Sequence, residues 1–389
     1  MIELENYVGR EQAYVKHVFL ENYLERLAHK AASSYPHIAY IDGFAGPWQS
    51  ASERFDDTSF GVALGALRSA KKTWQEKGKA VQLSAFLVEI ENEPYKKLEK
   101  IPSRFPDVSI RTYNSSFMSV LPTLMSHLPK DAFAFFFIDP KGWRIRLRDL
   151  KPLLDRENSE VVFNFMFDFI NRAININDAK ISAALDDLIP FGNWREKIQH
   201  AEQMAAGELL PEERKCIIVD AFRESLKILG KYQYVAETTI LRPISDRPLY
   251  SLCYATRHPK GIEVFRECQI KALREQSTTR AATKLRHAEN RSGQKEFFTS
   301  LHDMGPDDIQ RFLKTEVSQI ESALFEIIPR KPNWILYETL RAKVLERLVV
   351  KYSDVNAEAA RLRKSNGICI PDWEKGKRVP QAHYRITRA

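Results

Sequence analysis

The chain has 389 residues, 44% of them hydrophobic, and a formal net charge of +8, so it has enough length for two or three domains and enough apolar residues for a large core. Its most apolar segment, Ala132 to Ile138, has seven residues against the roughly 20 that span a bilayer, and the N-terminus shows no apolar signal region, so we expect a cytoplasmic protein without a membrane segment. Four widely separated cysteines without C-x-x-C spacing argue against a disulfide framework and against a metal site.

The first part of the chain alternates helical patterns with short apolar runs. Residues Glu11 to His29 carry apolar side chains at helical intervals and predict an amphipathic helix. The apolar runs that follow are nearly continuous rather than alternating, which is typical of strands covered on both faces in a parallel α/β sheet. The predicted strands are His37 to Asp42, Ser84 to Glu89, Val108 to Tyr113, Ala132 to Asp139 and Glu160 to Phe167, and the predicted helices between them are Phe60 to Gln75, Glu93 to Lys100, Phe117 to His127 and Leu147 to Leu154.

Two later strands, Tyr234 to Leu241 and Pro248 to Thr256, are separated only by a turn and predict a hairpin that closes one edge of the sheet. The stretch 171-230 before them is helical in pattern and too long for a plain crossover, so we expect an insertion that shapes a substrate site. From Lys271 to about Arg291 the chain is polar and basic, which suits either a long exposed helix or a linker. We expect a first domain over 1-275 and a helical linker over 276-330.

The last 59 residues carry most of the net charge, with 13 Lys and Arg against 6 Asp and Glu. Helical patterns at Asn333 to Val349 and Asp354 to Lys364 precede short strands at Gly367 to Ile370 and His383 to Ile386, which predicts a winged helix-turn-helix over 331-389. A nucleic-acid backbone is the expected partner, contacted by Arg361, Arg363, Lys364, Lys375, Lys377 and Arg378. The alternatives are a solvated basic surface and a winged helix that contacts another protein.

The first predicted strand runs directly into Asp42-Gly43-Phe44-Ala45-Gly46. Glycines permit close approach of the backbone to a ligand, and in open parallel sheets ligands bind beyond the carboxyl ends of the strands. Glu89 ends the second strand, where an acid accepts hydrogen bonds from ribose hydroxyls. Its separation from Asp42 is longer than the roughly 20 residues of a dinucleotide fold, which disfavours a dinucleotide. A plain strand-to-helix turn and a solvated glutamate are the alternatives.

The fourth predicted strand ends in Asp139-Pro140-Lys141-Gly142-Trp143. A carboxylate delivered by a buried strand to the edge of a sheet is unfavourable unless it has partners or a task. Lys141 either pairs with Asp139 or contacts a substrate phosphate, and Trp143 can stack on a base. Alternatively, Asp139 caps the turn that follows.

Together these segments resemble the first, second and fourth motifs of class I S-adenosylmethionine-dependent methyltransferases, particularly those that act on nucleic acids. More closely, "YIDGFAGPW", "FLVEIENEP", "FFFIDPKGW" and "PLYSLCYATRHPKGIEVFREC" resemble the bacterial three-Cys-motif partner (TcmP) family over roughly residues 10 to 275. That family has a methyltransferase-like Rossmann domain, often followed by a winged helix, and is named for a genomic association with a three-cysteine-motif protein similar to radical enzymes. The resemblance implies a Rossmann-like seven-stranded sheet, mostly parallel, with an antiparallel last strand.

The resemblance also implies S-adenosylmethionine as the cofactor and a role for each matching residue. Asp42 to Gly46 would wrap its methionine and ribose parts, and Glu89 would accept the ribose hydroxyls. The segment Tyr113 to Phe117, with Ser116 and Phe117 at its end, would flank the adenine. Asp139 would align or deprotonate the methyl acceptor.

Three departures from the pattern bear on the activity. Trp48 replaces the glycine that usually completes the first loop, and Ser116 stands where an aspartate often precedes the phenylalanine. The fourth motif is Asp-Pro-Lys-Gly rather than Asp/Asn-Pro-Pro-aromatic, which argues against adenine N6 chemistry. No cysteine follows Pro140, which argues against the covalent route to C5 of pyrimidines.

Two hypotheses follow from the sequence. In the first, the protein is a methyltransferase acting on DNA or RNA, with the C-terminal winged helix assisting substrate binding. In the second, the methyltransferase fold has lost activity and serves as a nucleic-acid-binding or scaffold subunit for a three-cysteine-motif partner.

Overall fold

The computed structural model describes residues 4–46, 50, 52, 55–292 and 306–388. The chain divides into two compact units, Met1–Arg257 and His258–Ala389. The boundary expected at residue 275 falls inside helix α11 (Pro259–Ser292). Trp48, the altered end of the first loop, lies outside the described residues.

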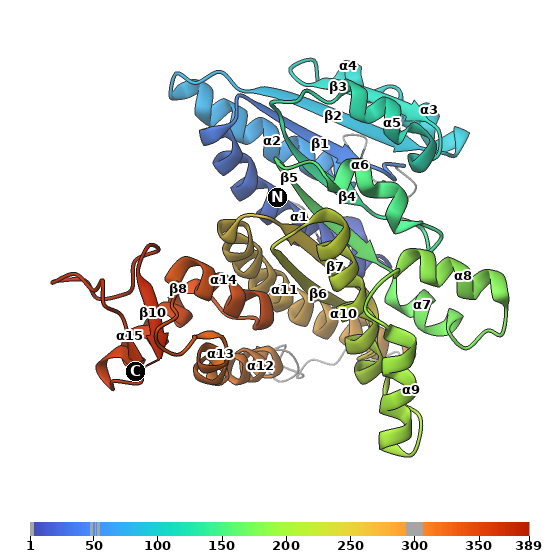
Figure 1. The fold of residues 1–389 in the computed structure, drawn as a ribbon. Helices are drawn as coiled ribbons and strands as arrows, with labels where there is room; N and C mark the ends of the chain where they lie inside the picture. The colour runs from blue at the N-terminus through green and yellow to red at the C-terminus, as the bar shows by residue number, and fades with distance from the viewer. Residues whose placement is uncertain (1–3, 47–49, 51, 53–54, 293–305, 389) are drawn as a thin grey trace. The chain divides into compact units, whose positions relative to one another are not determined.

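A seven-stranded sheet with the order β3-β2-β1-β4-β5-β7-β6 forms the centre of the first unit (Figure 1). Neighbouring strands pair in parallel except at β7, which is antiparallel to both β5 and β6. This order confirms the predicted Rossmann-like class I methyltransferase sheet with its one reversed strand and its edge hairpin. The strands are β1 (His37–Asp42), β2 (Gln82–Glu89), β3 (Ser109–Asn114), β4 (Phe133–Ile138), β5 (Ser159–Phe165), β6 (Tyr234–Leu241) and β7 (Pro248–Thr256).

Helices cover both faces of this sheet. A short 3-10 helix η1 (Leu4–Tyr7) precedes α1 (Glu11–Ser34), which packs with α2 (Ser59–Glu76) over one face. The opposite face is covered mainly by α5 (Phe117–His127), η2 (Leu147–Leu150), α6 (Lys151–Leu154) and α10 (Pro211–Gly230). The remaining helices of this unit are α3 (Asn92–Leu98), α4 (Ile101–Arg104), α7 (Phe167–Ala173), α8 (Ala179–Leu188) and α9 (Trp194–Ala205).

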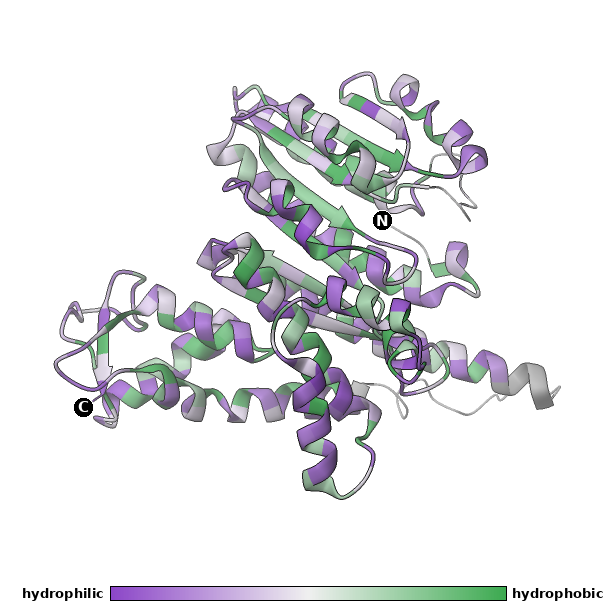
Figure 2. Ribbon diagram, turned by 45° about the vertical axis from the view of Figure 1, so that its right-hand side comes forward, coloured by the Kyte–Doolittle hydropathy of each residue, from purple (hydrophilic) through white to green (hydrophobic). Residues whose placement is uncertain are grey.

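The continuous hydrophobicity of the strands is explained by burial on both sides. Every residue of β1 and β5 is buried, and Figure 2 shows the inner strands predominantly in hydrophobic green. Because successive side chains of a strand point to opposite faces, Ile41 and Phe136 join the core under α5, while Tyr40 and Phe135 face the α1 side. The same alternation places Asp42 on the α1 side, which determines the neighbours of its carboxylate.

The stretch predicted as an insertion is helical, as expected. It contains α8, α9 and α10 between β5 and β6, and α7 begins just before it. Among the described residues, none of the helices is both long and apolar enough to cross a membrane. The cysteines are free thiols, with Cys253 and Cys268 buried.

The second unit combines helices with a small antiparallel sheet of order β8-β10-β9. The helix expected from Asn333 begins only at Tyr337, because Ile335 and Leu336 pair with β10 instead. Two short strands follow the second helix as predicted, but the last one begins at Arg385, two residues after the predicted start at His383, and pairs with the strand before it through Thr387 and Cys369. The elements after α11 are α12 (Pro306–Ser318), α13 (Ile320–Ile327), β8 (Ile335–Leu336), α14 (Tyr337–Arg347), α15 (Tyr352–Lys364), β9 (Ile368–Cys369) and β10 (Arg385–Arg388).

Helix α11 is attached to the rest of the second unit by buried polar contacts. The Glu263 side chain is only 3% exposed and its Oε1 lies 2.5 Å from the Arg341 guanidinium on α14. Arg266 donates to the carbonyls of Leu345 and Glu346, which end the same helix. Of the two possibilities for the polar stretch after Lys271, the structure has the helix, as a continuation of α11, but it is not fully exposed because Gln276, Thr279 and Thr283 are buried.

Candidate functional site

Asp42 ends β1 with a fully buried carboxylate that accepts three hydrogen bonds. The Tyr40 hydroxyl donates to Oδ2 at 3.0 Å, Ser59 Oγ donates to the same oxygen at 2.7 Å, and the Phe44 backbone N–H donates to Oδ1 at 3.0 Å. Burial raises the pKa of Asp42 to about 6, with the charge of Asp139 adding to the effect and these hydrogen bonds opposing it. The carboxylate thus fixes the start of the loop from inside the protein.

The loop after Asp42 is bonded to the strands on both sides of β1. The Gly43 N–H donates to the Phe137 carbonyl of β4 at 3.2 Å, and the Ala45 N–H donates to the Val88 carbonyl of β2 at 2.8 Å. A Cβ on Gly43 would lie 2.9 Å from the Phe117 ring, closer than real Cβ atoms approach. Glycine at this position is therefore required by packing, and it keeps the backbone of the loop free of side-chain bulk.

Glu89 ends β2 and is 4% exposed. Its Oε1 accepts the Glu91 N–H at 2.7 Å, and burial raises the pKa of its carboxyl while the charge of Lys141 acts in the opposite direction. Since Leu87 pairs with Asp42, the ends of β1 and β2 lie side by side. The structure therefore brings the two acids of the predicted cofactor site to one edge of the sheet.

The predicted adenine-flanking segment leads from β3 into α5. Ser116 is the N-cap of α5 and its Oγ accepts the Ser119 N–H at 3.2 Å. Phe117 is almost fully buried, and its ring packs against Phe44 with centroids 5.8 Å apart. The Phe117 side chain thus supports the first loop, whereas Ser116 is half-buried.

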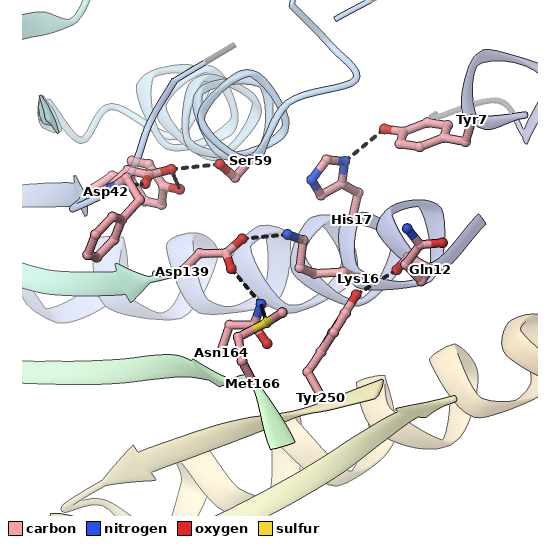
Figure 3. Close-up of polar contacts among 12 residues, drawn as sticks. Tyr7, Gln12, Lys16, His17, Asp42, Ser59, Asp139, Asn164, Met166 and Tyr250 are labelled. Carbon is pink, nitrogen blue, oxygen red and sulfur yellow. Dashed lines mark hydrogen bonds and ion pairs between the residues drawn. The ribbon is translucent and has the colours of Figure 1, made fainter. Parts of the chain in front are cut away.

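Asp139 directly follows β4, on the same side of the sheet as Asp42, and both of its oxygens are engaged (Figure 3). Lys16 Nζ of α1 lies 2.5 Å from Oδ2, and Asn164 Nδ2 of β5 donates to Oδ1 at 2.5 Å. The expectation that this carboxylate requires partners is thus met, but neither partner is Lys141. Lys141 is exposed, and Trp143 is partly buried against the core.

Lys16 and Asn164 were not predicted as site residues, although the sequence carries a signal for each. Asn164 is a polar residue within the apolar run of β5, and it is 2% exposed. Lys16 lies beside the buried Val15 on a helix whose apolar face packs on the sheet. A polar residue inside an apolar run indicates a buried polar contact, although its partner on another element cannot be identified from the pattern alone.

The six basic residues expected to contact nucleic acid lie on α15 and on the loop between β9 and β10. Arg361 forms ion pairs with Glu358 and Glu321. The Cζ atom of Arg363 lies 4.1 Å from the centre of the Trp373 ring. Lys377 is 3.9 Å from Glu374. The remaining three, Lys364, Lys375 and Arg378, are exposed and form no ion pair within the described part of the chain.

The edge formed by β1, β2 and β4 has a carboxylate at each of three strand ends. The Asp42 carboxylate is enclosed by its own donors, Glu89 accepts one backbone N–H, and the Asp139 side chain is 20% exposed. An acid at the end of the second strand can accept hydrogen bonds from the hydroxyls of a ligand. In the described ranges there is no group of three or more His, Cys, Asp or Glu placed to hold a metal ion.

No protein-family model matches the chain, and the search of curated proteins found no match. Among solved structures, a Legionella pneumophila str. Philadelphia 1 protein of family-model DUF519 is 13% identical, with 63% of this chain and 85% of that chain covered and a TM-score of 0.35. A loganic acid methyltransferase with S-adenosylhomocysteine is 8% identical, with coverages of 80% and 91% and a TM-score of 0.32. An O-methyltransferase family protein from Burkholderia thailandensis is 11% identical, with coverages of 64% and 60% and a TM-score of 0.25.

Proposed function

We propose that the protein is an S-adenosylmethionine-dependent methyltransferase that acts on a nucleic acid, either DNA or RNA. One observation carries the proposal: Asp42, Glu89 and Asp139 stand at the carboxyl ends of β1, β2 and β4, and the strand order reverses between β1 and β4. In open α/β sheets this switch point is where ligands bind.

Each residue at the switch point has a task in this proposal. The backbone of Asp42 to Gly46 holds the methionine and ribose parts of the cofactor, and Glu89 accepts the ribose hydroxyls. Ser116 lies beside the adenine, and Asp139 aligns the acceptor. When bound, the cofactor would supply a methyl group on a sulfonium, from which a neutral thioether leaves without acid assistance, so the protein mainly has to align the nucleophile and exclude water.

The nucleic-acid substrate is inferred from the second unit. Its helices α13, α14 and α15 and its sheet β8-β10-β9 have the succession of a winged helix, and the exposed cations lie on α15 and the loop before β10. Lys364, Lys375 and Arg378 are available for phosphate contacts, which contribute affinity without sequence information.

Methyl transfer from labelled S-adenosylmethionine to total RNA and total DNA tests the proposal. The wild-type protein should label one of the two nucleic acids, and Asp139→Ala should abolish the labelling. Asp139→Asn, which keeps the shape of the side chain, separates the loss of the charge from the loss of packing. Absence of label with the wild-type protein counts against the activity.

A second candidate function is favoured by one specific observation. Both oxygens of Asp139 are already bonded within the protein, as they would be if the carboxylate served only the fold. In this alternative the chain is a non-catalytic scaffold or nucleic-acid-binding subunit, and its TcmP-like motifs link it to a three-cysteine-motif partner. It predicts nucleic-acid binding by the wild-type protein with no transfer of label.

A further inference from the structure

The contacts of Asp139 come from two elements that no motif of the cofactor site includes. Lys16 lies on α1, 123 residues away in sequence, and Asn164 lies on β5. The Lys16 side chain is 13% exposed and its Nζ also lies 5.9 Å from the centre of the Phe137 ring. Two charge-assisted contacts, one to each oxygen, restrict the orientation of a carboxylate far more than one contact does.

The contacts of Lys16 and Asn164 with Asp139 are not the ones that stability alone would favour. Burying an ammonium and an amide beside a carboxylate is unfavourable relative to apolar packing unless each polar atom is satisfied. Asn164 is 2% exposed, yet its Oδ1 has no hydrogen-bond partner among the described residues, while its Nδ2 is held on Asp139. The amide nitrogen of Asn164 is thus oriented toward Asp139, and a buried polar group placed in this way fixes the second oxygen of the carboxylate.

From these contacts we infer that Lys16 and Asn164 are positioning residues for methyl transfer, a deduction that rests on the proposed function. They hold Asp139 with both oxygens fixed, so that the remaining lone pairs of the carboxylate point toward the acceptor in one orientation. They touch neither cofactor nor acceptor. Their loss therefore affects the rate of transfer at saturation and leaves the affinity for the cofactor unchanged.

The experiment uses the full chain with Lys16→Met, Lys16→Arg and Asn164→Leu, and with Lys30→Met as a matched control. Lys30 is exposed on the same helix, so its replacement removes the same charge away from the site. The probes are S-adenosylhomocysteine in a calorimetric titration, and labelled S-adenosylmethionine with whichever nucleic acid the wild-type protein labels. Thermal melting verifies that each variant folds.

Lys16→Met and Asn164→Leu are expected to lower kcat by about a hundredfold, the effect of a displacement of about 1 Å at a reacting group. KM for the cofactor and the affinity for S-adenosylhomocysteine should stay within about twofold of wild type. Lys16→Arg keeps the charge but not the shape of the side chain, so it should recover part of kcat and exceed Lys16→Met. Lys30→Met should behave as wild type.

A readout without cofactor complements the kinetics. If Lys16 acts through Asp139, the fall in melting temperature of the Lys16→Met, Asp139→Asn double variant is smaller than the sum of the two single falls. Unchanged kcat in the folded Lys16→Met protein, or an equal loss in Lys30→Met, overturns the inference while the proposed function stands. A wild-type protein that binds no S-adenosylhomocysteine and transfers no methyl overturns both.

Discussion

Replacing Asp42 with asparagine removes a charge from the interior of the first unit and keeps the shape of the side chain. The carboxylate has no solvent exposure, and its three donors are the hydroxyls of Tyr40 and Ser59 and the Phe44 N–H. An amide oxygen can still accept from the Phe44 N–H, and both hydroxyls can rotate to accept from the amide nitrogen. The substitution therefore tests the charge rather than the packing.

The magnitude follows from the pKa of Asp42, which burial raises from 3.8 to about 6. A shift of this size corresponds to about 3 kcal/mol of differential stability between the two protonation states. Because the folded-state pKa is raised, the stabilisation by proton binding is complete below the unfolded-state pKa and is lost as pH rises through about 6. Between about pH 7.5 and about pH 5, the wild-type protein should gain about 1 kcal/mol relative to Asp42→Asn.

Urea unfolding of both proteins at several pH values measures this difference in free energy. Hydrogen exchange of the β1 amides is the readout, so that unfolding of the first unit alone is observed. Titrating groups distant from Asp42 contribute equally to the two proteins and cancel in the difference, so what remains belongs to Asp42 together with Asp139, whose charge acts on it. A free-energy difference that stays constant from about pH 7.5 to about pH 5 would show that Asp42 does not titrate in this range, and the account of its burial would be wrong.

Three further predictions concern other parts of the structure. Gly43→Ala should lower the stability of the first unit by about 1–3 kcal/mol in thermal melting because its Cβ meets an aromatic ring, whereas Gly65→Ala on α2, with open space around it, should not destabilise. Arg341→Met should destabilise the second unit by about 3 kcal/mol in urea unfolding, since it leaves the buried Glu263 without its α14 partner, and a loss below about 1 kcal/mol would contradict that burial. Lys364→Ala should reduce the slope of log affinity against log salt for duplex DNA or RNA by about one, and an unchanged slope excludes a phosphate contact there.

The elements of the sheet were predictable because their physical signals are local. The bounds of β1, β6, β7 and α5 agree with the prediction to the residue. For the three strands the reason is that apolar runs ending in turn residues define both ends of a strand. The two-residue strand β8 was not predictable, because Ile335 and Leu336 fit a helical pattern and pair with β10 only through a contact distant in sequence. Tertiary pairing overrides local propensity at such positions.

The candidate site was predictable in part for the same reason. Asp42 and Glu89 end apolar strands and Asp139 directly follows one, and parallel strands bring their carboxyl ends to one edge. The partners of these acids were not predictable, because Ser59 and Lys16 come from helices whose rotation over the sheet is set by packing. A sequence pattern defines the face of a helix, but not which residue of another element that face will meet.

Calorimetric titration of the purified protein with S-adenosylhomocysteine tests the central claim most directly. The account predicts binding at one site per chain, weakened by about tenfold or more in Glu89→Gln because a carboxylate that accepts ribose hydroxyls is replaced by an amide. Glu93→Gln, which changes an exposed glutamate on α3, should bind as the wild type does. Absence of binding by the wild-type protein, or equal affinities of wild type and Glu89→Gln, would contradict the assignment of a cofactor site to the ends of β1 and β2.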